Sequence, residues 1–262
     1  MKQSSLLFSR NLLGLLLVLM TTSVHSFTPG KWSPLDSFLF QEGLVGPSSE
    51  IVKNAEGVVI ATAEYSYNKA GKLVSESYKD SSGSLEGETK YFYEANRLAR
   101  EERTSVSRET KELKVFSYDK EGKLTGVKVH GTGKDSQLNW RLHLSKTGIP
   151  LSGEARYIGE MKDQELFRTE KDQSGNLTQS ILGEGNRTLG EIQFKLGQNG
   201  EVVQRNYLQG DLERMQMFLY NSQGLLESIS FHVKQNGKWT LVKTHEWKYE
   251  KGKSMASKEE KL

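Results

Sequence analysis

Short runs of alternating apolar and polar residues, separated by polar turns, extend from about residue 51 to residue 250. Aromatic residues two positions apart, such as Tyr65 and Tyr67 or Phe116 and Tyr118, flank a polar residue. Successive side chains of a β-strand point to opposite faces of the sheet. The spacing therefore predicts antiparallel strands with one buried face and one solvated face.

A turn signal recurs about every 26 residues, and such a period is the mark of a repeat architecture. In the clearest copies, Asn68 or Asp119 follows the aromatic pair and precedes Gly71 or Gly122 by three positions. Asn or Asp at the start of a type I turn, with a left-handed glycine at its end, forms a common three-residue hairpin loop. Asn96 fills one glycine slot, because Asn tolerates positive φ well. The predicted structural turn positions are Gly71, Asn96, Gly122, Gly148, Gly175, Gly200, Gly224 and Gly252.

A second, looser set of turns falls near the middle of each period, at residues 54–57, 80–83, 131–133, 183–186, 209–211 and 236–237. The spacing between neighbouring turns leaves room for strands of about eight residues and predicts an all-β fold. Eight repeats of two strands give a long antiparallel meander of roughly sixteen strands. A sheet this wide must curl, fold into two layers or close. We expect a curled or two-layered sheet, and closure into a barrel stays open.

The first 26 residues have the organisation of a cleaved signal peptide. Lys2 and Arg10 precede a Leu-rich run, and Val24 and Ser26 fit the small-residue rule for cleavage after Ser26. The apolar run of about ten residues is shorter than the ~20 residues of a membrane span. An uncleaved anchor is the alternative, and no transmembrane helix is expected in the mature chain.

The rest of the chain divides into three parts. Residues 27–50 lack the repeat and are predicted to form a leader that packs on the end of the main body. Residues 51–250 form the predicted repeat domain, and the Lys-rich residues 251–262 are predicted to be a disordered tail, with a docking tail as the alternative.

Composition narrows the function classes. The chain has no cysteine, so it has neither disulfides nor a thiol nucleophile. Removal of Lys2 and Arg10 with the signal peptide reduces the 36 basic residues to 34, against 33 acidic residues, which is a net charge of +1. The charges are interspersed, and this pattern is not typical of nucleic-acid binding. We expect an exported monomer that is periplasmic, surface-associated or secreted.

The repeat resembles a known family. Phe116 to Leu124 is similar to the YD repeat of Rhs-type bacterial proteins, Tyr65 to Leu73 and residues 218–225 are close copies, and residues 172–177 keep only the turn half. The resemblance implies a strip of β-hairpins that curls into a shell, which in large members encloses a toxic C-terminal domain. This chain has about eight degenerate units and no self-cleaving or toxin segment that we recognise, so the resemblance implies the fold and not toxin delivery. The MORN-like repeat is a weaker match.

Four histidines follow the signal peptide: His130, His143, His232 and His245. A two-residue loop at residues 236–237 would place His232 opposite Leu241, with His245 on the same face but roughly 13 Å away at ~3.3 Å per residue. Two histidines so far apart cannot share a metal ion. We interpret the histidines as structural or solvated, with a metal or catalytic role as the alternative.

Two further sequence patterns are similar to a phosphate-binding loop and to a catalytic carboxylate pair. Residues 131–135 read Gly-Thr-Gly-Lys-Asp, but a phosphate loop needs four residues between its glycines and Ser or Thr after the Lys, so a turn is favoured. Glu101 and Glu102 are assigned to a charged, solvated face, because their spacing does not set two carboxylates across a cleft. A catalytic carboxylate pair is the alternative. The sequence predicts no catalytic residue, no metal site and no cofactor.

The aromatic residues of the repeats are the only group of side chains whose spacing stands out as a candidate binding site. We interpret them as the sheet core, with a lipid-facing girdle or an exposed platform for glycans or peptides as alternatives. The candidate binding aromatics are Tyr65, Tyr67, Tyr91, Tyr93, Phe116 and Tyr118. Residues 98–104 are polar on both faces and argue against a porin-like membrane barrel.

These observations lead to a functional hypothesis. We expect a non-enzymatic exported repeat protein that presents an extended β surface to a protein or glycan of the cell envelope or outside the cell. A secreted enzyme with a site built from loops is one alternative. An outer-membrane or lipid-associated β protein is the other.

Overall fold

The computed structural model describes residues 46–131, 137–144, 150–158, 164–173, 175–199 and 201–249. These residues form sixteen β-strands and one 3-10 turn, η2 (Glu184–Asn186), with no α-helix among them. The strands are β1 (Ser49–Asn54), β2 (Val59–Tyr67), β3 (Leu73–Asp80), β4 (Leu85–Glu94), β5 (Arg97–Ser105), β6 (Thr110–Tyr118), β7 (Leu124–Gly131), β8 (Gln137–Leu144), β9 (Pro150–Ile158), β10 (Gln164–Lys171), β11 (Leu177–Leu182), β12 (Thr188–Leu196), β13 (Val202–Gln209), β14 (Leu212–Tyr220), β15 (Leu226–Gln235) and β16 (Lys238–Lys248). The predicted signal peptide, residues 27–45 of the leader and the Lys-rich tail lie outside the described residues.

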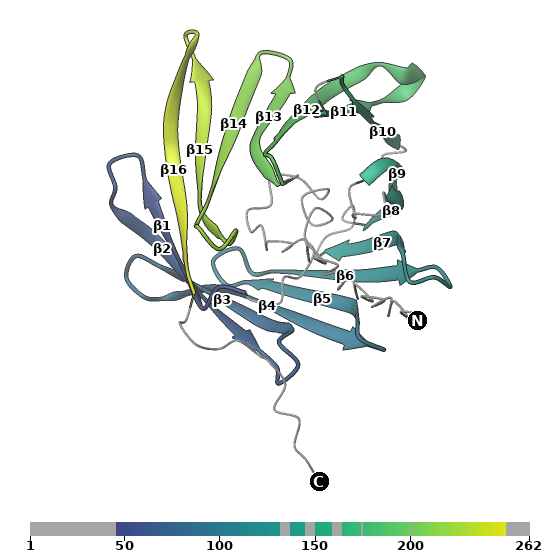
Figure 1. Ribbon diagram of the computed structural model, residues 1–262. Helices are drawn as coiled ribbons and strands as arrows, with labels where there is room; N and C mark the ends of the chain where they lie inside the picture. Colours follow the sequence, from purple (N-terminus) through teal and green to yellow (C-terminus); the bar gives the residue numbers. More distant parts are fainter. Residues whose placement is uncertain are drawn as a thin grey trace, which may run out of the picture.

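Each strand pairs antiparallel with the next along the chain, and β1 also pairs with β16, so the sheet closes into a barrel (Figure 1). The prediction of an all-β antiparallel meander is confirmed. Closure is one of the three ways in which a sheet this wide can bury its apolar face, and it leaves no unpaired edge strand. No helix in the described part of the chain is long and apolar enough to cross a membrane.

The described turns of the 26-residue period lie at one end of the barrel, after even-numbered strands, and we call this the repeat-turn end. In the turn between β2 and β3, the side-chain Oδ1 of Asn68 accepts hydrogen bonds from the backbone N–H groups of Ala70 and Lys72, both at 3.0 Å. Gly71 closes this turn with φ of 79°. An acceptor side chain followed by a left-handed glycine thus builds the corner.

The same geometry recurs along the repeat-turn end. Gly122, Gly175 and Gly224 have φ of 87°, 88° and 75°. Gly148, Gly200 and Gly252 lie outside the described residues. The turn at Asn96 is different, because Ala95 and Asn96 both have positive φ and Glu94 pairs directly with Arg97. This copy has one residue fewer between its aromatic pair and the corner, so it forms a two-residue loop of the type I′ kind.

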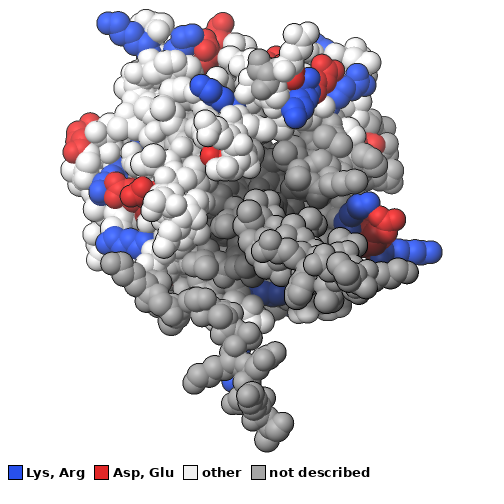
Figure 2. Space-filling model, in the orientation of Figure 1, with Lys and Arg blue, Asp and Glu red and all other residues white. Residues whose placement is uncertain are grey.

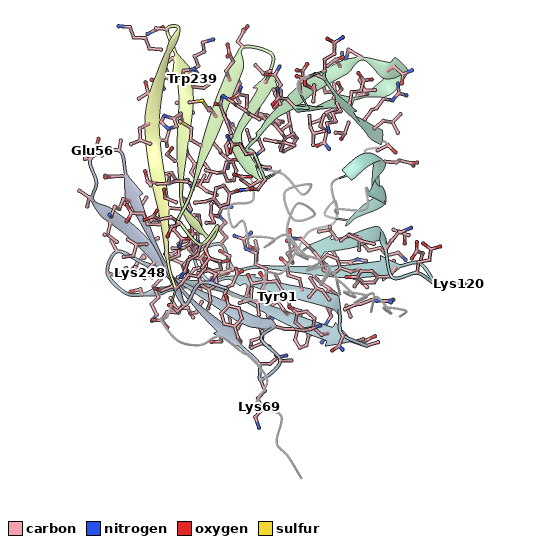
Figure 3. The ribbon with its side chains drawn as sticks, in the orientation of Figure 1. Glu56, Lys69, Tyr91, Lys120, Trp239 and Lys248 are labelled. Carbon is pink, nitrogen blue, oxygen red and sulfur yellow. The ribbon has the colours of Figure 1, made fainter. Side chains whose placement is uncertain are left out.

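The described turns after odd-numbered strands lie at the opposite end, which we call the mid-period end. Gly57, Gly83 and Gly210 have positive φ there, as do Asn236 and Gly237 in the loop between β15 and β16. Figure 3 shows the two ends, with Glu56 and Trp239 at the mid-period end and Lys69 and Lys120 at the repeat-turn end.

The main hydrophobic core fills the corner where the first and last strands meet. Its buried members come from β2, β3, β14, β15 and β16, and they are Ala63, Tyr65, Leu73, Phe218, Leu226, Ile229, Phe231 and Trp247. Tyr91 of β4 also packs against this cluster, so strands from both sides of the closure share one core. A second cluster consists of Leu177, Ile192 and Phe194 on β11 and β12.

The second aromatic residue of the repeat is a tyrosine in five copies, and each of these tyrosines has a defined partner. In five copies this tyrosine donates its hydroxyl hydrogen bond to a backbone carbonyl near the start of the preceding strand or segment. The pairs are Tyr67 with Pro47 (2.8 Å), Tyr93 with Leu73 (2.9 Å), Tyr118 with Leu98 (2.8 Å), Tyr220 with Val202 (2.9 Å) and Tyr249 with Leu226 (2.8 Å). Four of these acceptors belong to the apolar residue that follows the turn of an earlier repeat. In four of these copies the tyrosine therefore ties its repeat to the one before it.

Candidate functional site on the inner wall and the apolar rim

The inner wall of the barrel carries buried polar and charged side chains as well as the apolar core. Nine strands each contribute one such residue: Glu50, Glu76, Thr89, Glu101, Lys114, Gln179, Arg205, Gln216 and His245. The strand registers place them on the same face as the buried core residues, for example Glu76 opposite Tyr65 and His245 opposite Ile229. Buried charges require partners, so their contacts decide what this wall can do.

One polar cluster lies across the seam between β1 and β16. A carboxylate oxygen of Glu50 accepts a 2.5 Å hydrogen bond from the hydroxyl of Tyr65, and its other oxygen contacts Nδ1 of His245. Trp247 donates its indole N–H to the Tyr65 oxygen at 3.3 Å. The imidazole of His245 also lies between the rings of Phe231 and Trp247, with centroids 4.8 and 6.0 Å away. The two aromatic rings and the carboxylate of Glu50 hold the imidazole in place.

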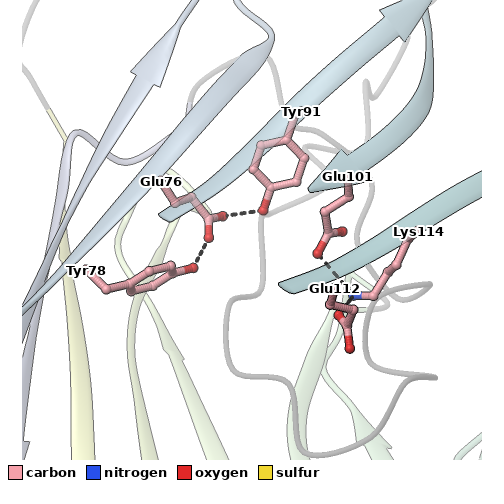
Figure 4. A network of polar contacts seen from close by, with 6 residues as sticks. All are labelled: Glu76, Tyr78, Tyr91, Glu101, Glu112 and Lys114. Carbon is pink, nitrogen blue, oxygen red and sulfur yellow. Dashed lines mark hydrogen bonds and ion pairs between the residues drawn. The ribbon is translucent and has the colours of Figure 1, made fainter. Parts of the chain in front are cut away.

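A second polar cluster follows on β3–β6 (Figure 4). The carboxylate of Glu76 accepts hydrogen bonds from the hydroxyls of Tyr78 and Tyr91, the latter at 2.7 Å. On the next strands, the ammonium of Lys114 lies 3.0 Å from a carboxylate oxygen of Glu101, and both side chains are less than 10% exposed. In the two clusters, three buried carboxylates find their hydrogen-bonding and ion-pair partners among other side chains of the inner wall.

Burial changes the pKa values of two tyrosines in these clusters. It raises the pKa of Tyr65 well above its ordinary value of 10.0, and the carboxylates of Glu50 and Glu76 raise this pKa further. Burial also raises the pKa of Tyr91 well above 10.0, with Glu76 and Glu101 adding to the effect. Both phenols therefore stay neutral and act as hydrogen-bond donors to the carboxylates.

The six candidate binding aromatics all lie on this inner face. Tyr65 belongs to the buried core, and Tyr67, Tyr91, Tyr93, Phe116 and Tyr118 are partly buried. The hydroxyls of the five tyrosines donate to a carboxylate or to a backbone carbonyl of the barrel. These contacts favour the interpretation of the stripe as core, and a binding role for it stays a prediction.

The structure corrects two expectations about single residues. Glu101 lies buried on the inner wall and not on a solvated face, because it is opposite Lys114 and pairs with it, whereas Glu102 points outward and pairs with Arg100. His232 does lie opposite Leu241, but a register shift between Phe231 and His232 changes the alternation of β16. His245 is therefore on the inner face and His232 on the outer face, and not both on one face as expected.

The described part of the inner wall offers one candidate general base, His245. A histidine whose Nδ1 contacts a carboxylate has the orientation of a general base. His245 nevertheless lies within the packed core, 9% exposed, between Phe231 and Trp247. Among the residues that the structure describes, no three His, Asp or Glu side chains gather in a way that could hold a metal ion.

A different feature lies at the mid-period end of the barrel. Seven large apolar side chains, each between 37% and 58% exposed, lie in or next to the turns of this end. We call them the apolar rim: Val58, Val59, Ile60, Leu85, Val106, Leu212 and Trp239. They come from five hairpins that follow one another around the closed sheet, namely β13–β14, β15–β16, β1–β2, β3–β4 and β5–β6.

Hydrogen bonds and registers connect these hairpins. Asn54 at the end of β1 pairs with Lys243 of β16, and the N–H of Val106 donates to the carbonyl of Glu86 at 2.8 Å. The described turns of the repeat-turn end have a different character, with polar residues such as Lys69 and Lys120. The two ends of the barrel therefore present different chemistry.

The outer wall between the two ends carries ion pairs. Outward ion pairs join Lys79 to Glu64 and Arg100 to Glu102, at 2.9 and 3.0 Å. In the space-filling view, Lys and Arg are interspersed with Asp and Glu, and neither sign forms a large area on this face (Figure 2). The local sequence pattern does not reveal the apolar rim, because single apolar residues next to turns look like ordinary strand ends.

Comparisons with known proteins bear on the fold. No protein-family model matches this chain, and no curated protein matches it in sequence. A solved porin-like protein from Bacteroides uniformis ATCC 8492 is similar to it, with a TM-score of 0.50 and 11% identity, over 78% of this chain and 96% of that chain. At this identity the likeness shows the fold alone.

Two solved toxin-complex structures match more weakly. TcdB2-TccC3-Cdc42 has a TM-score of 0.26 and 9% identity, over 71% of this chain and 15% of that chain. TcdB2-TccC3 without its hypervariable C-terminal region has the same score and identity, over 77% and 16%. Scores this low support no further conclusion.

Proposed function

We propose that the protein is an exported, non-enzymatic binding protein that attaches through its apolar rim to a component of the cell envelope or to a macromolecule outside the cell. The gathering of exposed apolar side chains on five successive hairpins at one end of the barrel carries this proposal. Exposed apolar residues that gather in one region mark interaction sites more often than scattered ones do. The charged outer wall and the polar opposite end would keep the remainder of the barrel in water.

Export is part of the proposal and rests on the N-terminal sequence. The Leu-rich run behind Lys2 and Arg10 and the small residues up to Ser26 support a cleaved signal peptide. A chain without cysteine also folds equally well in an oxidising compartment. N-terminal sequencing of the protein from its source should begin at Phe27, and a chain that still begins at Met1 would contradict export by this route.

The absence of catalysis is also proposed. The best candidate for a general base, His245, lies between two aromatic rings in the core that closes the barrel. Its contact with Glu50 joins the first strand to the last, which gives the pair a structural task. These features support a binding protein that needs no cofactor.

We extend the proposal to the partners and to the origin of the repeats. The closed ring has no unpaired edge to recruit a second strand, which supports a monomer. Interspersed charges give little attraction to nucleic acid. Kinship of the repeats with YD repeats is supported by the aromatic, Asp and Gly positions of residues 116–124, which form one hairpin corner in the barrel.

Attachment can be tested with the native envelope fraction. We expect the chain to co-sediment with this fraction, and the triple variant Leu85→Ser, Val106→Ser, Trp239→Ser to lose most of this binding. The three positions lie on three different hairpins of the rim. Exposed substitutions of this kind usually change stability by less than about 0.5 kcal/mol each, so the variant should remain folded.

The matched control is the double variant Met217→Ser, Leu219→Ser. Met217 and Leu219 are 47% and 56% exposed, which is comparable with the rim, but they lie on the outer wall of β14. The control should bind as the parent does. Equal binding by the rim variant and the parent, or an equal loss in the control, would overturn the proposal.

A further inference from the structure

We infer that the component bound by the rim is the surface of a lipid bilayer with zwitterionic headgroups, and that the neighbouring β15–β16 and β1–β2 hairpins insert into it. This inference rests on the proposed function, since it names the partner of the same surface. The residues that carry it are the rim residues Val58, Val59, Ile60 and Trp239 and, outside the rim on β16, Val242, and they are 39% to 58% exposed.

The geometry brings the apolar residues of the two hairpins close together. Val58 accepts a backbone hydrogen bond from Asn54 at 2.9 Å, and Asn54 pairs with Lys243 next to Val242. Val58 and Val242 are thus two strand spacings apart, about 10 Å. Trp239 lies further along β16, next to the loop at Asn236 and Gly237. The apolar side chains extend outward from the ends of hairpins, and a protruding surface of this shape fits a soft partner.

The side chains have the chemistry of the bilayer interface. Trp239 lies beside Lys238, and the ammonium of Lys234 is 5.8 Å from the centre of its indole ring. Tryptophan is enriched where a protein meets lipid headgroups, and lysines next to it can extend toward water. Valine and isoleucine on the adjacent hairpin supply the apolar area that enters the acyl boundary.

The charges of the two hairpins select the headgroup. Lys53 is paired with Glu246, and Lys234 is paired with Glu213, so each of these lysines is compensated. At the tips, Lys238 on one hairpin and Glu56 on the other have opposite signs. A surface with balanced charge gains little from an anionic membrane and matches headgroups that carry both a phosphate and an ammonium group.

The absence of cysteine from the chain permits a site-specific test. Single substitutions Val58→Cys, Val242→Cys and Leu219→Cys are labelled with nitrobenzoxadiazole in the full chain, so every sample has the same N-terminal segment. Phosphatidylcholine vesicles are then added, with or without brominated acyl chains. We expect brighter, blue-shifted emission and quenching by bromine at positions 58 and 242. The label at position 219, on the outer wall of β14, should not respond.

A second measurement uses vesicle flotation of the unlabelled chain. The variant Val58→Ser, Ile60→Ser, Trp239→Ser should lower partitioning at least about tenfold, which corresponds to about 1.4 kcal/mol. Addition of phosphatidylglycerol should change the partitioning of the parent by much less than this factor.

The outcomes separate the lipid inference from the proposed function. If labels at positions 58 and 242 do not respond to vesicles while the rim variants still lose envelope binding, the rim binds another partner and the lipid inference is wrong. If the rim variants also bind the envelope fraction as the parent does, both the lipid inference and the proposed function are wrong. A response that requires phosphatidylglycerol, or one of equal size at position 219, also overturns the inference.

Discussion

Glu50 and His245 are 195 positions apart in the sequence, and their side chains are in hydrogen-bonding contact where the first and last strands close the barrel. The contact is buried, and the hydroxyl of Tyr65 donates to the same carboxylate. The closure of the sheet therefore rests on a side-chain cluster as well as on the backbone pairing of β1 with β16.

This arrangement predicts that Glu50→Ala destabilises the barrel. The change leaves the hydroxyl of Tyr65 and Nδ1 of His245 without their buried acceptor, at about 1–3 kcal/mol each. The matched control is Lys53→Ala, which breaks the exposed ion pair with Glu246 across the same two strands and should cost less than about 1 kcal/mol. Urea unfolding measures both. Equal losses would show that the buried cluster contributes no more than the exposed pair.

The buried pair of Lys114 and Glu101 gives a second prediction. Lys114→Met should cost about 3–5 kcal/mol, because it removes the buried ammonium that is paired with the buried carboxylate of Glu101. Adding Glu101→Gln should recover part of this loss, and a double-mutant cycle by urea unfolding gives the coupling. Lys90→Met breaks the exposed pair with Glu88 and serves as the control. Strictly additive effects of the two buried substitutions would contradict the pairing.

The turn geometry predicts the effect of replacing single glycines. Gly122→Val should lower the free energy of unfolding by about 2 kcal/mol, because a residue with a Cβ is strained at positive φ. A Cβ at Gly122 would also meet the side chain of Arg97, whereas a Cβ at Gly224 would meet nothing within 4 Å. Gly224→Val therefore isolates the backbone strain, and Gly122→Asn should be tolerated better. Unchanged thermal stability of both valine variants would contradict the left-handed corners.

The accuracy of the sequence-based expectations follows from the range of the forces involved. The corners and strands were predictable because Asn68 and Gly71, like Asp119 and Gly122, form a turn from neighbouring residues alone. Closure was left open because the pairing of β1 with β16 joins residues far apart in the sequence. Nothing in the local pattern specifies that contact.

The site was less predictable than the fold. Glu101 was expected on the wet face because an isolated glutamate gives no sign of its partner, and Lys114 lies on the next strand. The face of His245 depended on a register shift that alternation alone cannot show. The apolar rim is made of residues such as Leu85 and Val106, which become neighbours only when the hairpins align around the barrel.

The tyrosine bonds between repeats predict small, separate losses. Tyr93→Phe and Tyr118→Phe each remove a hydroxyl bond to a backbone carbonyl and should cost about 1 kcal/mol. Phenylalanine keeps the ring, so the contacts of Lys72 and Arg97 with these rings remain and only the hydroxyl is tested. The double variant should lose the sum in thermal or urea unfolding. Full stability of all three variants would mean that the hydroxyls do not tie the repeats together.

The buried tyrosines predict a loss of stability in alkali. Because burial and nearby carboxylates raise the pKa of Tyr65 and Tyr91 in the folded state, these phenols bind protons more tightly folded than unfolded. Their contribution is complete below about pH 10 and falls as the pH rises from there through the folded pKa, by about 1.4 kcal/mol per pH unit for each group. Urea unfolding between pH 9 and pH 11 measures this slope. Tyr91→Phe should make the slope shallower by one group, although it also removes the bond to Glu76 at all pH values. A slope that is the same in the parent and in Tyr91→Phe would show that this phenol ionises equally easily in both states.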